Sequence, residues 1–235
     1  GAIIPRSVGT NPLLTISGLA ERNCQLIVQE MGVKLDYAFP EIAAQPDTTG
    51  KTGVQFTETM RGYFTTEETA DYEKAYDLGK LADSPLEFTL TIQIEDVDAF
   101  VEHPEHEAGM VGTVTAPVFS SAPLTVSAAR FNLFVEDEQD RLRKKMKYRM
   151  HMHSVEGKTY FFDGYKDIYD DSGMDVWEDT TQLYITVYDG EDARANVLGT
   201  GKLRIKVADF TKQMTTMKAI HPDSKVKGAQ AVAKF

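Results

Sequence analysis

The dipeptide Asn11-Pro12 is the part of the sequence whose residue types are best placed to do chemistry. Asn11 suits the N-cap of a helix and Pro12 suits its first position. Gly32 would end that helix in a left-handed conformation. The free N–H groups of such a helix start can hold an anion or the electron-rich edge of a ring. The helix itself is predicted by apolar residues spaced three or four apart, at Leu13, Ile16, Ala20, Cys24, Ile27 and Met31.

The segment that contains this dipeptide, GAIIPRSVGTNPLLTISGLAER at 1–22, resembles the C-terminal signature of a known enzyme family. The family is the glucose–methanol–choline (GMC) family of FAD-dependent oxidoreductases, and the closest branch is the cholesterol-oxidase-like one. The resemblance implies that Asn11 is a catalytic residue, which faces the flavin and the substrate hydroxyl. It also implies a set of cofactor-binding residues: Gly1, Ala2, Asn11, Pro12 and Leu13.

The chemistry of a flavin agrees with this resemblance. A reduced flavin carries negative charge at its pyrimidine end, and fixed N–H groups at a helix start would stabilise that charge. The side chain of Asn11 offers both a donor and an acceptor, so it could orient an alcohol. The GxGxxG fingerprint of an FAD domain does not occur in the sequence. We therefore expect a C-terminal fragment of a sterol or alcohol oxidoreductase, in which only the full-length parent binds FAD and transfers hydride from a hydroxyl carbon.

Composition and charge exclude some partners. The 235-residue chain is 42% hydrophobic and 26% charged, which is ordinary for a globular protein. Its net charge of −11 argues against nucleic acid, whose phosphates repel an acidic surface. Its apolar runs are too short for a membrane span. Cys24 is the single cysteine, so no internal disulfide can form, which is compatible with the cytoplasmic location that we expect.

Changes in pattern along the chain predict four regions. Residues 1–32 would be the tail of a GMC-type FAD domain. Residues 33–53 lose the helical period and contain Pro40, Pro46 and Gly50, so they are predicted to be a linker. Residues 54–210 would form an antiparallel β-domain. Residues 211–235 are expected to be a helical C-terminal tail that looks truncated, and its last part, from His221, to have no packing partner.

The β-domain prediction depends on an apolar period of two. It is clearest at 86–94, where apolar and polar residues alternate strictly. Further strands are predicted at 54–64, 110–118, 124–135, 146–153, 158–168, 182–188 and 197–207, and short helices at 96–106 and 209–217. The fold class is thus mainly β with flanking helices (α+β). Short turns between strands favour a closed up-and-down β-barrel of lipocalin-like shape, with a β-sandwich as the alternative.

One strand of this domain carries candidate binding residues on each face. Met146, Tyr148, Met150 and Met152 share a face that could line an adaptable, lipid-sized cavity, or could be ordinary packed core. His151 and His153 share the other face with Lys147 and Arg149. Those two cations would repel a metal ion, so we predict no metal site there.

Three functions remain open. The β-region contains phrases, FNLFVEDE and WEDTTQLYITV, that resemble an appendage following the GMC signature in long bacterial oxidoreductases, and that resemblance implies no chemistry. The first function is the parent oxidoreductase. The second is a barrel that binds a sterol or another apolar small molecule, which predicts a cavity on the order of several hundred cubic ångströms. The third is a structural domain that packs on the remainder of the oxidoreductase, which predicts an exposed apolar patch.

Overall fold

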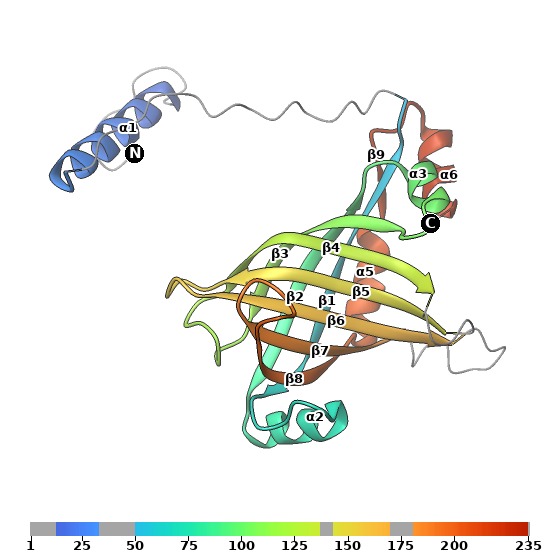
Figure 1. The fold of residues 1–235 in the computed structure, drawn as a ribbon. Coiled ribbons are helices and arrows are strands. Elements are labelled where there is room, and N and C mark those ends of the chain that lie inside the picture. The colour runs from blue at the N-terminus through green and yellow to red at the C-terminus, as the bar shows by residue number, and fades with distance from the viewer. Residues whose placement is uncertain (1–12, 33–49, 137–142, 170–180, 235) are drawn as a thin grey trace. The chain divides into compact units, whose positions relative to one another are not determined.

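A computed structural model describes residues 13–32, 50–136, 143–169 and 181–234 (Figure 1). The chain divides into two compact units, Gly1–Asp47 and Thr48–Phe235. The first unit contains helix α1, Leu13–Glu30. Gly32 follows it in a left-handed conformation (φ +69°), and its N–H donates to the carbonyl of Gln29 at 3.0 Å. A glycine thus ends the helix where the sequence predicted.

The second unit is built on a closed barrel of eight antiparallel strands, as the sequence analysis favoured over a β-sandwich. Each strand pairs with the next along the chain, and β1 pairs with both β2 and β8, which closes the barrel (Figure 1). The strands are β1 Gly53–Thr65, β2 Pro85–Ile94, β3 Glu107–Thr115, β4 Leu124–Glu136, β5 Arg143–His153, β6 Thr159–Tyr169, β7 Gln182–Asp189 and β8 Asn196–Arg204.

Strand β1 has different partners along one of its edges. Residues 61–65 pair with β8, and residues 53–55 pair with a short ninth strand, β9, Lys218–Ile220. Between these two stretches the helix α5, Val207–Thr216, lies against β1. The hydroxyl of Thr216 accepts a hydrogen bond from the backbone N–H of Thr57 at 2.8 Å. A helix therefore takes the place of strand pairing here, and its side chains reach the barrel interior.

Within the described ranges, three further helices pack on this unit. Helix α2, Tyr72–Leu81, begins at Asp71, whose carboxylate accepts from the N–H groups of Glu73 and Lys74, and it covers the outside of β1 and β8. Helix α3 spans Val97–Glu102 and helix α6 spans Lys225–Lys234. Figure 1 shows α3, α6 and β9 gathered at one end of β1. We find no helix in the described ranges whose length and hydropathy suit a membrane crossing.

The structure corrects the prediction for the C-terminal residues. The region 211–235 is not wholly helical, because β9 interrupts it and joins the sheet beside β1. The stretch after His221 does have a packing partner, since Ala231 of α6 is buried in the core and Gly228 lies against Ala219 and Pro222. Small residues allow this close approach. They also weaken the apolar period, which is why the sequence pattern did not reveal the packing.

The barrel interior is filled solidly at the end where β1 stops and β2 begins. The ring of Phe119, from the β3–β4 connection, lies 4.9 Å from that of Phe64 and 4.8 Å from that of Tyr160. The hydroxyl of Tyr160 donates to the carbonyl of Phe119 at 3.4 Å. We call the interior around Phe64, Phe119, Tyr160 and Phe162 the packed end. Here side chains close the barrel, as is usual in small barrels.

Candidate functional site

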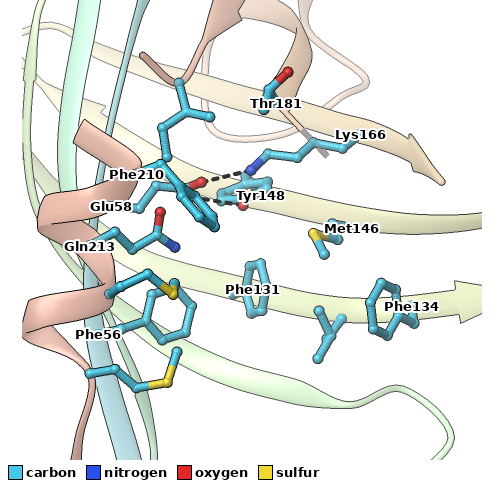
Figure 2. A pocket seen from close by; sticks show the side chains of 14 residues that line it. Phe56, Glu58, Phe131, Phe134, Met146, Tyr148, Lys166, Thr181, Phe210 and Gln213 are labelled. Atoms are coloured by element: carbon cyan, nitrogen blue, oxygen red, sulfur yellow. Dashed lines mark hydrogen bonds and ion pairs between the residues drawn. The ribbon is translucent and has the colours of Figure 1, made fainter. Parts of the chain in front are cut away.

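The interior is hollow on the side that α5 covers. A cavity of about 290 Å³ lies between that helix and the sheet (Figure 2), and we call it the Glu58 cavity. Its wall is largely apolar and comes from several strands and from α5. The apolar residues that line it are Phe56, Phe131, Leu133, Phe134, Met146, Ile205, Phe210, Met214 and Met217, and the others are Glu58, Tyr148, Lys166, Thr181 and Gln213.

Three polar side chains meet inside this apolar wall. The ammonium Nζ of Lys166 lies 2.7 Å from Oε1 of Glu58, and the hydroxyl of Tyr148 donates to Oε2 of Glu58 at 2.8 Å. Only 4% of the Lys166 side chain and 3% of the Glu58 side chain are exposed. Figure 2 shows both bonds converging on Glu58. We call Glu58, Tyr148 and Lys166 the polar trio.

The strands place the trio through the two-residue period. Glu58 is the inward residue of β1 between Phe56 and Met60, and Lys166 occupies an inward position of β6. Tyr148 lies on β5, paired in register with Gly164 of β6. Because inward positions of a small barrel are desolvated, a charge there is tolerated only when it is paired and hydrogen-bonded. Glu58 and Lys166 therefore depend on each other, and Tyr148 supplies a further hydrogen bond to Glu58.

The ring of Tyr148 is held by its neighbours. It lies 5.1 Å from the ring of Phe131 and 6.0 Å from that of Phe88, and Nζ of Lys166 lies 5.2 Å from its centroid. Burial raises the pKa of the Tyr148 hydroxyl well above 10.0, and the adjacent charge and hydrogen bond of Glu58 raise it further. The hydroxyl is therefore a fixed donor to the carboxylate across the physiological range.

This arrangement suits binding of a small molecule. Binding pockets are typically concave, mostly apolar and provided with a few convergent polar groups that orient the ligand. The Glu58 cavity has each of these features, with the polar groups gathered at one place in its wall. Among the described residues, no group of three or more His, Cys, Asp or Glu side chains is arranged to hold a metal ion.

Of the residues that the sequence assigned to FAD, the structure describes only Leu13. Leu13 is the first residue of α1 in the other compact unit. Gly1, Ala2, Asn11 and Pro12 lie outside the described residues. The catalytic role of Asn11 and the cofactor-binding set remain predictions of the sequence resemblance.

The methionine and tyrosine face of β5 serves both roles that the sequence left open. Met146 and Tyr148 line the Glu58 cavity, whereas Met150 and Met152 are fully buried in the core. On the outer face of β5, Nε2 of His153 lies 2.6 Å from the hydroxyl oxygen of Ser127. Nε2 of His151 lies 2.7 Å from the carbonyl oxygen of Glu191.

Sequence reasoning missed Glu58 and Lys166, although both leave a signal. In each of their strands every second residue faces inward, and these inward residues are otherwise apolar. Glu58 and Lys166 are charged residues at such inward positions. In β1 the inward series reads Val54, Phe56, Glu58 and Met60. Two opposite charges that interrupt inward series on different strands predict a buried ion pair. The pattern cannot show that a cavity lies beside them.

The chain was compared with protein-family models, with curated proteins and with solved structures, and none of the three comparisons gave a match.

Proposed function

We propose that the barrel unit binds a small apolar molecule in the Glu58 cavity. The observation that carries this proposal is an apolar cavity that closes on a buried polar trio inside a β-barrel. A barrel interior filled throughout by side chains would have argued against binding. Here side chains fill the packed end, whereas the interior beside α5 is hollow.

The size of the cavity limits the ligand. Pockets for small molecules commonly measure about 300–1,000 Å³, and the volume of about 290 Å³ lies at the bottom of that range. A compact molecule or a single alkyl chain fits this space. A rigid sterol is a larger body, so it would fit only with part of its ring system projecting past α5.

Helix α5 is the wall through which a ligand would most easily pass. Met214 of this helix is 44% exposed and also lines the cavity. Its side chain therefore lies between the cavity and the solvent. Methionine side chains adapt readily to different ligand shapes. Phe134, on the opposite wall, is likewise 39% exposed.

The proposal is tested with N-phenyl-1-naphthylamine, a neutral apolar dye that fluoresces when it leaves water. We expect saturable enhancement with the full chain. Met214→Trp should weaken dye binding at least about tenfold, because the larger ring would fill the space behind α5. Val226→Trp is the matched control, since Val226 lies on α6, is 66% exposed and does not line the cavity. Equal binding by both variants, or no saturable binding to the wild type, would refute the proposal.

A second candidate function comes from the N-terminal residues. We propose that residues 1–32 belong to an FAD-dependent oxidoreductase of the GMC type, with Asn11 positioning the substrate hydroxyl. The support is the resemblance of GAIIP and GTNP, at 1–5 and 9–12, to the signature of that family. In an enzyme that joins this segment to an FAD domain, Asn11→Ala should slow flavin reduction by substrate. An unchanged rate of reduction would remove Asn11 from the mechanism.

A further inference from the structure

The charges inside the Glu58 cavity cancel without a ligand. Lys166 contributes one positive charge and Glu58 one negative charge, and the two groups are in contact at 2.7 Å. Among the described residues that line the cavity, no other is Asp, Glu, Lys, Arg or His. A ligand therefore meets a wall whose described residues already carry no net charge.

The trio nevertheless keeps hydrogen-bonding capacity. A lysine ammonium has three N–H donors, and a carboxylate has about four acceptor sites. Within the described residues, Lys166 donates one hydrogen bond, to Glu58, and the carboxylate of Glu58 accepts two, from Lys166 and Tyr148. A ligand hydroxyl could accept from Lys166 and donate to Glu58. A ligand carbonyl could accept from Lys166 alone.

An anionic ligand would upset the balance of charge between Lys166 and Glu58. A carboxylate placed beside Lys166 would compete with Glu58 and leave one negative charge uncompensated in an apolar, desolvated wall. A buried charge without its own partner is strongly unfavourable. A hydroxyl or carbonyl adds no charge and needs only a hydrogen bond, which the trio can supply.

We propose that the Glu58 cavity selects neutral ligands with a terminal hydroxyl or carbonyl, such as medium-chain alcohols, over the corresponding carboxylates. This inference rests on the proposed function of the cavity as a binding site. The alkyl part occupies the apolar wall and the polar end contacts the trio. Glu58 is the specificity-determining residue, because its negative charge already neutralises Lys166.

The inference is tested by displacing N-phenyl-1-naphthylamine from the full chain with decan-1-ol, sodium decanoate or decane. Wild type should prefer decan-1-ol to decanoate at least about tenfold. It should also bind decan-1-ol more tightly than decane, which lacks a polar end. Glu58→Gln keeps the shape of the side chain and removes its charge. The preference should then reverse, because a ligand carboxylate would replace the lost partner of Lys166.

Two further variants complete the test. Glu87→Gln is the matched control, since Glu87 also accepts from a cation, Arg61, but does not line the cavity. It should leave the preference unchanged. Lys166→Gln leaves the negative charge of Glu58 in place, so it should increase the preference for decan-1-ol over decanoate. This variant keeps the inference testable if Glu58→Gln fails to fold.

The outcomes separate the two proposals. If dye binding does not depend on Met214, the proposed binding function fails. If dye binding does depend on Met214 but decan-1-ol and decanoate displace it equally well, or if Glu58→Gln leaves the wild-type preference intact, only the inference about neutral ligands is overturned.

Discussion

The two halves of the barrel interior differ in how their space is filled. At the packed end, the ring of Phe119 lies within 5 Å of the rings of Phe64 and Tyr160, and these side chains fill the space. On the side of α5, the walls stand apart around about 290 Å³ of space, and the polar trio lies within them. One sheet, with one alternation of residues, thus encloses both a solid core and a largely apolar cavity.

The difference teaches where stability and function reside in this barrel. Close packing contributes dispersion and hydrophobic free energy in proportion to the contacts made. A cavity gives up part of that contribution and keeps buried polar groups that cost desolvation. We therefore expect the packed end to stabilise the fold and the Glu58 cavity to set its binding chemistry.

The largest expected effect is the loss of a ring at the packed end. Phe162 is fully buried, and its ring lies 6.3 Å from that of Phe88. Phe162→Ala should lower the free energy of unfolding by about 3–5 kcal/mol, measured by urea denaturation. Phe131→Ala, in the cavity wall, should cost less, because one face of that ring already borders empty space. Equal costs would show that the two halves are packed alike.

The next effect concerns the buried ion pair. Lys166→Met would leave Glu58 as an unpaired charge in the wall and should cost about 3 kcal/mol in unfolding free energy. Adding Glu58→Leu to that variant should restore most of the loss, since an apolar pair needs no compensation. If the double variant is less stable than the single one, the trio holds the fold together and is not primarily a device for binding.

Much of the fold could be predicted from the sequence. The period of two in segments such as 86–94 placed the eight barrel strands, because half-buried strands impose that alternation. The short turns between strands then favoured closure. The prediction for the end of the chain was wrong, because Gly228 and Ala231 pack without an apolar period strong enough to show it.

The site was harder to predict than the fold. The alternation of residues along each strand predicts that Glu58 and Lys166 face inward. Their contact, however, depends on the register between strands that are far apart in sequence. The cavity depends on α5 replacing strand pairing along β1, which no local pattern specifies. Sequence gives the direction of a side chain, whereas the volume left between walls is a property of the whole barrel.

A smaller effect should appear at alkaline pH through Tyr148. Its pKa is raised in the folded state, mainly by burial, so the stability it contributes is present below about pH 10 and is lost as the pH rises further. Tyr148→Phe should cost about 1 kcal/mol at neutral pH, because Glu58 loses one donor. Above pH 10 that deficit should shrink, by up to about 1.4 kcal/mol per pH unit, since phenylalanine does not titrate. A constant deficit between pH 8 and 11 would place the hydroxyl in contact with water.

The smallest expected effect separates the two halves most sharply. On the surface beside the packed end, Glu156 accepts hydrogen bonds from the backbone N–H and the hydroxyl of Ser121, which lower its pKa to about 2. The stability that these bonds contribute is present above the ordinary pKa of about 4.5 and is lost as the pH falls toward 2. Glu156→Gln should therefore speed hydrogen exchange of the Ser121 amide at neutral pH and remove most of its acid dependence.

The same variant should leave dye binding in the Glu58 cavity unchanged. Glu68→Gln is the matched control, because the pKa of Glu68 is also lowered to about 2, chiefly by Lys74, and Glu68 makes no contact with Ser121. If Glu156→Gln alters dye affinity while Glu68→Gln does not, the packed end and the cavity are energetically coupled. The barrel interior would then be one cooperative unit, and binding of a ligand in the cavity would change the stability of the β3–β4 connection.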